Sequence, residues 1–321
     1  MTQVCDPIGA GEAQAQTSAP AVCAVIVHYR CAAALAACLD SLGAHAPGVP
    51  AIVVENGSGD ASAIEAVATA ERAGAHVVAA PANRGFGAGC NLGIALALAR
   101  WPELQHVLLL NPDTAIEPGC VEALRATAQR HPDAGVVGGS VVSLDGRQVL
   151  FENGRFRPWT LSHSHVAAPA AAEFTTTFVT GALMLVAADL LRAGLRFDER
   201  FFLYTEDLDL CCAVRARGRS LWIHKAAVAR HAEGGSQRDE QPIVADLRPT
   251  QLRHMTRSKV YFARKRLPPL QRAVFLAVAL LVKPLLGMFV ARSWRFLPIY
   301  LGGLREGWRV PLEPRAGAAP R

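Results

Sequence analysis

The first half of the chain alternates short apolar runs with helical segments, and this pattern restricts the possible folds strongly. Runs of five to seven apolar residues are typical of strands that are buried on both faces. Parallel strands need crossover helices between them, so the pattern predicts an α/β fold with a mostly parallel central sheet and helices on both faces. The predicted strands span residues 21–29, 51–56, 76–80 and 106–113. Two of the predicted helices span residues 31–42 and about 61–73, and two more begin after residues 85 and 117.

Polar residues cluster where these predicted strands end. Ligands of such sheets bind at the carboxyl ends of the strands. This rule selects one rim, made of residues 28–30, 55–60, 83–91 and 111–113. We therefore expect the functional site of this half to lie along that rim.

The second half has a different pattern. Residues 174–186 predict a strand that runs into a buried segment, 208–217 a short helix and 220–231 an apolar strand pair. Residues 232–247 are polar and rich in glycine, which is typical of a loop. A basic helix is predicted to follow at about 250–266.

The charge of the chain is unevenly distributed. The net charge is +6, but residues 248–321 hold 15 Lys or Arg against 2 acidic residues, which leaves −7 on the rest. An acidic body with a basic, apolar tail predicts a soluble domain held at an anionic membrane surface. Nucleic acid is disfavoured as a partner, because the basic residues of the tail alternate with long aliphatic runs and not with base-stacking aromatic residues.

The apolar part of the tail is interrupted. A spanning helix needs about 20 apolar residues, but Lys283 and Pro284 divide the run after ten uncharged residues. Interfacial or hairpin insertion is therefore favoured over a true span. A core helix of the soluble domain stays open as an alternative, because each run alone has the length of a core helix.

Cysteine usage and the first residues indicate the compartment. The eight cysteines form no CxxC pair and no metal-ligand spacing, which favours reduced thiols in the cytosol. Residues 1–20 lack the basic start and apolar centre of a signal peptide, and we interpret them as a disordered leader.

Several residues could carry chemistry, although each has a plain structural alternative. Asp113 follows a buried strand and could hold a divalent cation, or it could end the strand in an Asx-turn. His231 could be a ligand of the same cation or a structural histidine. Glu206 or Asp207 could act as a general base, because the neighbouring aromatic residues would raise the proton affinity of a carboxylate.

The motifs together resemble those of the family 2 glycosyltransferases, and within them the rhamnosyltransferase-like branch. The resemblance covers about residues 21–265, and its segments occur in the family's order and spacing. They are "VIVHYR", "IVVENGSGD", "NRGFGAGCNLG", "VLLLNPDT", "DAGVVGG", "VTGALMLV", "FDERFFLYTEDLDL" and "AVARHAEGGS".

The resemblance implies a GT-A fold with a catalytic domain over 21–247, divided into a nucleotide-binding half (21–145) and an acceptor half (146–247). The membrane-associated tail over 248–321 is predicted from its charge and apolar runs. It also implies roles for single residues. Asp113 and His231 would bind Mg²⁺ or Mn²⁺, and Asp207 would be the catalytic base of the Glu206–Asp207 pair. Residues implied to line the nucleotide are Tyr29, Glu55, Asn56, Asn83, Gly85, Asn91 and Asn111.

The function implied is an inverting, metal-dependent transfer of a sugar from a nucleotide-diphospho-sugar to a hydroxyl of a lipid-linked or polysaccharide acceptor. Such an enzyme would lie peripherally on the inner face of the plasma membrane. Two departures from the family pattern, "HYR" at the end of the first strand and Glu55 in place of Asp, affect the donor base. A deoxythymidine-diphosphate sugar such as rhamnose and a uridine-diphosphate sugar are both candidates.

The sequence disfavours two alternative functions. A pyrophosphorylase or a dehydrogenase would need a glycine loop directly after the first strand, and "VIVHYRCAAA" has none. A catalytically degenerate protein that binds a sugar nucleotide, or scaffolds polysaccharide assembly, is disfavoured because Asp113, Asp207 and His231 are all present.

Overall fold

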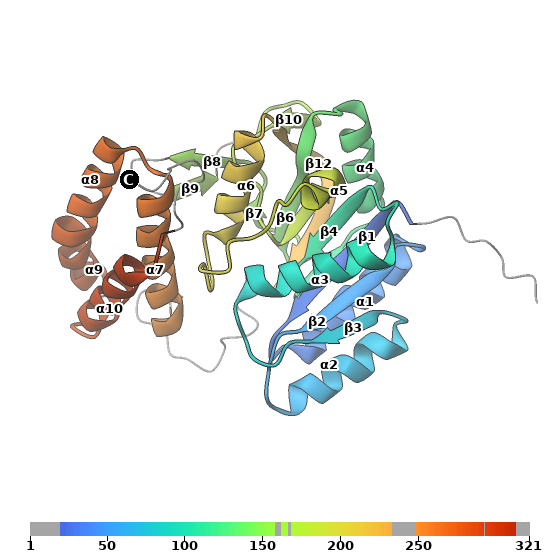
Figure 1. Cartoon of the computed structure of the whole chain (residues 1–321), viewed down its shortest axis with the longest axis horizontal. Coiled ribbons are helices and arrows are strands. Elements are labelled where there is room, and N and C mark those ends of the chain that lie inside the picture. The colour runs from blue at the N-terminus through green and yellow to red at the C-terminus, as the bar shows by residue number, and fades with distance from the viewer. Residues whose placement is uncertain (1–19, 158–161, 166–167, 233–247, 292, 313–321) are drawn as a thin grey trace, which may run out of the picture.

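The computed structural model describes residues 20–157, 162–165, 168–232, 248–291 and 293–312. Its centre is a ten-stranded sheet in the order β10-β12-β6-β11-β4-β1-β2-β3, with β5 paired to β12 and β7 paired to β6 (Figure 1). The predicted leader falls almost entirely on residues outside the described ranges, as does most of the predicted loop 232–247.

The first half folds as the sequence pattern predicts. Strands β1, β2, β3 and β4 run parallel in the order β3-β2-β1-β4, and a helix follows each of the first three. Their bounds are β1 Val22–His28, α1 Ala32–His45, β2 Ala51–Glu55, α2 Ala61–Arg72, β3 His76–Ala79, α3 Phe86–Arg100, β4 His106–Leu110, β5 Thr114–Ile116 and α4 Cys120–Arg130.

Helices cover both faces of β1, because alternate residues of a strand point to opposite sides. Helix α3 packs on the face that carries Val25 and Val27, and its backbone comes very close to them at Gly93 and Gly89. A Cβ atom added at Gly93 would lie 2.4 Å from Val25 Cγ1. On the opposite face the imidazole of His28 accepts a hydrogen bond from the Cys31 amide, directly before α1.

The second half makes the sheet mixed. Strand β11 lies antiparallel between β4 and β6, whereas β12 runs parallel to β6. The elements are β6 Ala134–Ser143, β7 Val149–Phe151, β8 Gly154–Arg157, β9 Ser162–His165, β10 Glu173–Thr175, β11 Leu183–Ala187, α5 Ala188–Arg192, α6 Glu206–Ala216 and β12 Ser220–His231.

Two expectations for this half need correction. The apolar stretch 174–186 contains two separate strands, β10 and β11, which pair with different neighbours. The expected strand pair at 220–231 is the single strand β12, with an irregularity between His224 and Val228. A register shift of this kind interrupts the pairing without reversing the chain.

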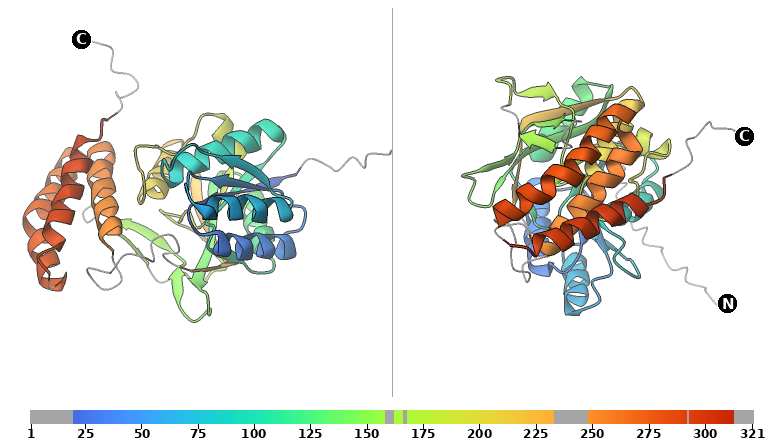
Figure 2. Two further views of the ribbon diagram at one scale, coloured as in Figure 1. Left: turned by 90° about the horizontal axis from the view of Figure 1, so that it is seen from below. Right: turned by 90° about the vertical axis from the view of Figure 1, so that its left-hand side faces the viewer.

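The C-terminal helices gather on one side of the sheet, and α7 lies between the sheet and the others (Figures 1 and 2). The elements are α7 Pro249–Arg266, α8 Pro269–Ala277, a π-helical segment η2 Val278–Val282, α9 Lys283–Ala291 and α10 Phe296–Arg309. Helix α10 packs closely on α7, since a Cβ atom at Gly307 would lie 2.3 Å from the Arg257 carbonyl oxygen.

The segment Pro269–Ala291 is long and apolar enough to cross a membrane, and 17% of its most apolar window is buried. The low burial argues against the core-helix alternative. The length and composition of this segment fit both interfacial insertion and a membrane-spanning helix.

Candidate active site

The carboxyl ends of β1, β2 and β4 form one rim. His28 lies beside Glu55 in the pairing of β1 with β2, and Ile26 lies beside Leu110 in the pairing of β1 with β4. The residues that follow these strands therefore lie along the same edge of the sheet. They include the predicted site residues Tyr29, Glu55, Asn56, Asn111 and Asp113.

Asp113 and His231 meet on this rim although 118 residues separate them in the sequence. Strand β5 pairs with β12, which places Thr114 opposite His231. His231 Nε2 then lies 3.0 Å from Asp113 Oδ1 and 3.2 Å from Asn111 Nδ2. Both side chains of the Asp113–His231 pair are mostly buried, with 11% and 15% exposed.

The chemistry of this pair fits a divalent cation. If Nε2 carries no proton, its lone pair faces a carboxylate oxygen at 3.0 Å, and a cation between them would remove that repulsion. Neighbouring ligands of an octahedral ion at ~2.1 Å also lie roughly 3 Å apart. Among the residues that the structure describes, no group of three or more His, Cys, Asp or Glu side chains could hold a metal. The protein would therefore supply few ligands and leave positions open for other donors.

Asp207 reaches the same part of the rim from the start of α6. Its carboxylate accepts hydrogen bonds from the amides of Gly181 at 3.2 Å and Leu208 at 2.8 Å. The next residue, Ala182, accepts the amide of Asn111 through its carbonyl oxygen at 3.3 Å. The dipeptide Gly181–Ala182 thus joins Asp207 to the Asn111–Asp113 turn, because β11 starts where β4 ends.

Glu206 has a different environment from its neighbour. The side chain is buried, and among the described residues its Oε2 atom has no hydrogen-bond partner. Burial, and then the charge of Asp207, raise the pKa of Glu206 above its usual value. A carboxyl group that stays protonated at higher pH, and lacks access to solvent, is poorly placed to accept a proton from a substrate.

The backbone before this acidic pair is strained. Tyr204 and Thr205 both have left-handed φ angles, +67° and +74°, which cost roughly 1–2 kcal/mol per non-glycine residue. Consecutive residues of this kind persist only where the surroundings hold them, and they are concentrated at functional sites.

The two glycine-rich rim loops are tied to each other. Asn56 donates to Asn83 Oδ1 at 3.2 Å and to the Gly85 carbonyl at 3.1 Å. Gly85 has φ +95°, and a Cβ atom there would lie 2.0 Å from the Phe202 carbonyl oxygen. Gly85 thus allows the loop that contains Asn83 to contact the segment that precedes Glu206.

Glu55 and Asn91 make mainly internal contacts. The Glu55 carboxylate accepts the amides of Gly57 at 3.2 Å and Ser58 at 2.7 Å. Asn91 bonds both backbone polar groups of Phe197 at 3.0 Å. Tyr29 lies under the guanidinium group of Arg30, which is 5.1 Å from the ring centre.

A family model described as "Glycosyltransferase like family 2" matches residues 20–257. This chain belongs to glycosyltransferase family 2. The glycosyltransferase is also 28% identical over 216 residues, 60% of this chain, to N-acetylglucosaminyl-diphospho-decaprenol L-rhamnosyltransferase from two strains of Mycobacterium tuberculosis, of which the match covers 69%.

Solved structures share its GT-A fold. They include GalNAc-T7 with UDP, GalNAc and Mn²⁺ (12% identity, TM-score 0.57, 84% of this chain), S. aureus TarS (15%, 0.55, 90%) and the mannosyltransferase PcManGT from Pyrobaculum calidifontis with GDP-Man and Mn²⁺ (14%, 0.52, 94%). This glycosyltransferase spans 58%, 49% and 77% of those chains. The prediction of a nucleotide-sugar glycosyltransferase is confirmed.

Helix α7 contributes contacts to the site that the sequence pattern did not indicate. Ser258 Oγ donates to the Leu203 carbonyl at 2.8 Å, and Tyr261 packs against Phe201 with ring centres 4.7 Å apart. Lys265 Nζ lies 2.7 Å from Asp198 and 2.8 Å from Asp209. These contacts fix the chain on both sides of the strained residues Tyr204 and Thr205.

Asp209 lies in the first turn of α6, but its partners are residues of α7 and not residues of its own helix. Its carboxylate is buried and bonds Lys265 and Arg266, the latter at 2.6 Å. No local signal could have shown this, because the partners lie more than 50 residues away in the sequence.

Proposed function

We propose that this glycosyltransferase moves a sugar, with inversion at the anomeric carbon, from a nucleotide-diphospho-sugar to a hydroxyl of a lipid-linked or polysaccharide acceptor in cell-surface glycan synthesis. One observation carries the proposal: Gly181–Ala182 connects the Asp207 carboxylate to the turn that contains Asp113. The name of the M. tuberculosis relative supports a rhamnosyl donor and a lipid-linked acceptor.

Asp207 is the proposed catalytic base. Two amide hydrogen bonds stabilise its ionised form and fix the direction of its carboxylate. In this role it accepts the proton of the acceptor hydroxyl as the oxygen attacks the anomeric carbon from the side opposite the leaving diphosphate. Glu206 is proposed to support the start of α6 from within the protein rather than to transfer a proton.

Asp113 and His231 are the proposed protein ligands for Mg²⁺ or Mn²⁺, and Asn111 lies next to the imidazole. When bound, such a cation neutralises the charge that develops on the diphosphate. The Mn²⁺-containing structures with the same fold support this proposal. Glu55, Asn56, Asn83, Gly85, Asn91 and Tyr29 are proposed to shape the nucleotide pocket, several of them by positioning the loops.

The proposed location is the inner face of the plasma membrane, with residues 21–247 as the catalytic domain and the tail at the membrane. The exposed apolar segment Pro269–Ala291 supports this placement. Helix α7 contacts Phe201 and Leu203. We therefore propose that α7 belongs to the tail and also supports the catalytic site.

The test is sugar transfer from a panel of deoxythymidine-, uridine- and guanosine-diphosphate sugars with Mn²⁺, comparing the natural protein with Asp207→Asn. We expect one donor to be used, and the variant to lose about 10²- to 10⁴-fold in transfer rate while binding that donor within a few-fold. Asp40→Asn, an exposed position on α1, is the matched control.

Two outcomes would contradict the proposal. Loss of donor binding in Asp207→Asn would remove Asp207 from the role of base. Donor binding without transfer or hydrolysis in the natural protein, across the whole panel, would favour a degenerate binding protein.

A further inference from the structure

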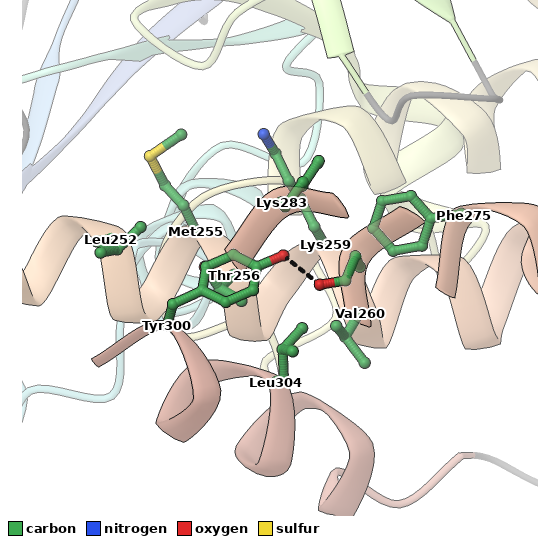
Figure 3. A pocket seen from close by; sticks show the side chains of 10 residues that line it. Leu252, Met255, Thr256, Lys259, Val260, Phe275, Lys283, Tyr300 and Leu304 are labelled. Atoms are coloured by element: carbon green, nitrogen blue, oxygen red, sulfur yellow. Dashed lines mark hydrogen bonds between the residues drawn. The ribbon is translucent and has the colours of Figure 1, made fainter. Parts of the chain in front are cut away.

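The tail contains a cavity of about 190 Å³ between α7, the α8–α9 segment and α10 (Figure 3). Its wall is largely apolar and includes Leu252, Val260, Phe275 and Leu304. The Tyr300 hydroxyl donates to the Ala279 carbonyl at 3.0 Å, so this polar group on the wall is already bonded. The volume is several times the roughly 30 Å³ occupied by one liquid water molecule.

Two lysines, Lys259 of α7 and Lys283 of α9, line the same cavity. Among the residues that the structure describes, neither ammonium group forms an ion pair with a carboxylate. Lys283 lies over the Phe275 ring, 5.3 Å from its centre. Burial, and then the nearby charge of Lys283, lower the pKa of Lys259 to about 8. Two cations placed together in an apolar wall are unfavourable unless an anion joins them.

The surroundings of the cavity indicate which kind of anion fits. Lys283 interrupts an apolar helical segment whose neighbouring side chains are strongly exposed: Leu280 57%, Leu281 70%, Leu285 66% and Leu286 57%. A free anion would leave this apolar surface uncovered. The leucines do not line the cavity, but a bilayer would supply a lipid phosphate for the two lysines and would also cover the exposed leucines of the same segment.

We propose that this cavity binds the headgroup phosphate of an anionic phospholipid, held between Lys259 and Lys283. Lipid binding there would fix the tail at a defined depth and orientation on the membrane. Because α7 also contacts the segment that precedes Glu206, the bound lipid would fix the orientation of the proposed catalytic rim relative to the membrane. The proposal does not depend on the sugar donor or on the acceptor.

The experiment is co-sedimentation of the full-length chain with vesicles of phosphatidylcholine, alone or with one third phosphatidylglycerol. The test variant is Lys259→Met/Lys283→Met. The matched control is Arg305→Met/Arg309→Met, which removes two exposed charges from α10 outside the cavity and changes the net charge equally.

We expect the lysine variant to bind phosphatidylglycerol vesicles at least about twentyfold more weakly, because each lysine loses a charge-assisted contact to the phosphate in a partly desolvated cavity, and such a contact contributes a factor of roughly five or more. Its binding to phosphatidylcholine alone should not change. Its melting temperature should stay the same or rise, because methionine fills the apolar wall without a buried charge. The arginine variant should keep its binding within a few-fold.

Three results would overturn the proposal. Equal losses in the two variants would indicate general attraction to the surface. Unchanged binding of the lysine variant would show that the cavity does not hold the headgroup. A rise in the melting temperature with millimolar inorganic phosphate that requires the lysines, without a lysine-dependent effect on vesicle binding, would identify a site for free phosphate.

Discussion

Glu206 and Asp207 are neighbours in the chain, yet their carboxyl groups have opposite surroundings. Asp207 accepts two amide hydrogen bonds and is partly exposed, whereas Glu206 is buried with an oxygen atom that has no partner among the described residues. Adjacent carboxyl groups in such different environments can divide the tasks of a site, because burial raises the pKa of Glu206 whereas two amides stabilise the ionised form of Asp207. Apolar neighbours in the sequence indicated a perturbed carboxyl group, but only the fold shows that it is Glu206.

Glu206→Gln tests this difference through stability. The folded-state pKa of Glu206 is raised above its unfolded value of about 4.5, so the natural protein gains stability from the protonated form below that pH. This contribution is lost as the pH rises toward the folded pKa, at up to about 1.4 kcal/mol per pH unit. Thermal melts between pH 4.5 and 8 should show the variant becoming progressively more stable than the natural protein.

The variant should also keep most of its transferase activity. A melting curve that shifts in parallel with the natural protein at every pH would show that Glu206 does not change its protonation state on unfolding. Loss of transfer with normal donor binding would instead assign proton transfer to Glu206.

His231→Gln tests the metal site. Removing one of the two proposed protein ligands should raise the Mn²⁺ concentration for half-maximal transfer by at least about tenfold, while saturating Mn²⁺ restores part of the activity. The measurement is a Mn²⁺ titration of transfer, with His45→Gln at the end of α1 as the control. An unchanged titration in His231→Gln would exclude the histidine as a ligand.

At the scale of elements, local patterns predicted the parallel half well and the mixed half poorly. The runs of β1, β2 and β4 are mainly apolar and almost fully buried, as strands covered on both faces are, whereas the edge strand β3 is only partly buried. The insertion of β11 between β4 and β6 depends on antiparallel pairing over many residues, which leaves no local periodicity. The same limit applies to the site: Asp113 was identified from its strand end, but its contact with His231 depends on the register of β5 and β12.

The ion pairs of α7 show a similar limit. Lys265 looks like one of several basic residues on a solvated helix, but it joins Asp198 and Asp209, which are 8% and 4% exposed. Without Lys265, Asp198 would keep Arg200 and Asp209 would keep Arg266, so each buried carboxylate would lose one of its two cationic partners. Lys265 is the residue that joins the two carboxylates to each other, and it therefore supports the segment between them.

Lys265→Met should lower the free energy of unfolding by about 1.5–3 kcal/mol, the size of a lost hydrogen bond between charged groups, and reduce transfer more than donor binding. Lys225→Met is the matched control, because that lysine donates only to the Pro169 carbonyl among the described residues. Denaturant unfolding and transfer kinetics are the measurements. Equal, small effects of the two substitutions would show that α7 does not support the segment.

At the scale of the whole molecule, one surface is unlike the rest. Leu281, Leu285 and Phe289 are 70%, 66% and 81% exposed and follow one another at intervals of four residues, so they lie on one face of the segment Pro269–Ala291. An apolar band of this kind on an exposed helix marks a membrane or protein contact. The basic residues that flank it favour an anionic membrane.

Leu281→Gln/Leu285→Gln/Phe289→Gln should abolish most membrane binding, because burying each of these side chains in a bilayer contributes about 1.5–3 kcal/mol. Their exposure in the folded protein means that the melting temperature should change little. The control is Ile64→Gln, which replaces a side chain that is 76% exposed on α2 in the other half of the molecule. Flotation with vesicles measures the binding.

Transfer to a water-soluble acceptor should persist in the triple variant, because the apolar band lies outside the rim. If the triple variant still floats with vesicles as the natural protein does, the tail is not the membrane contact.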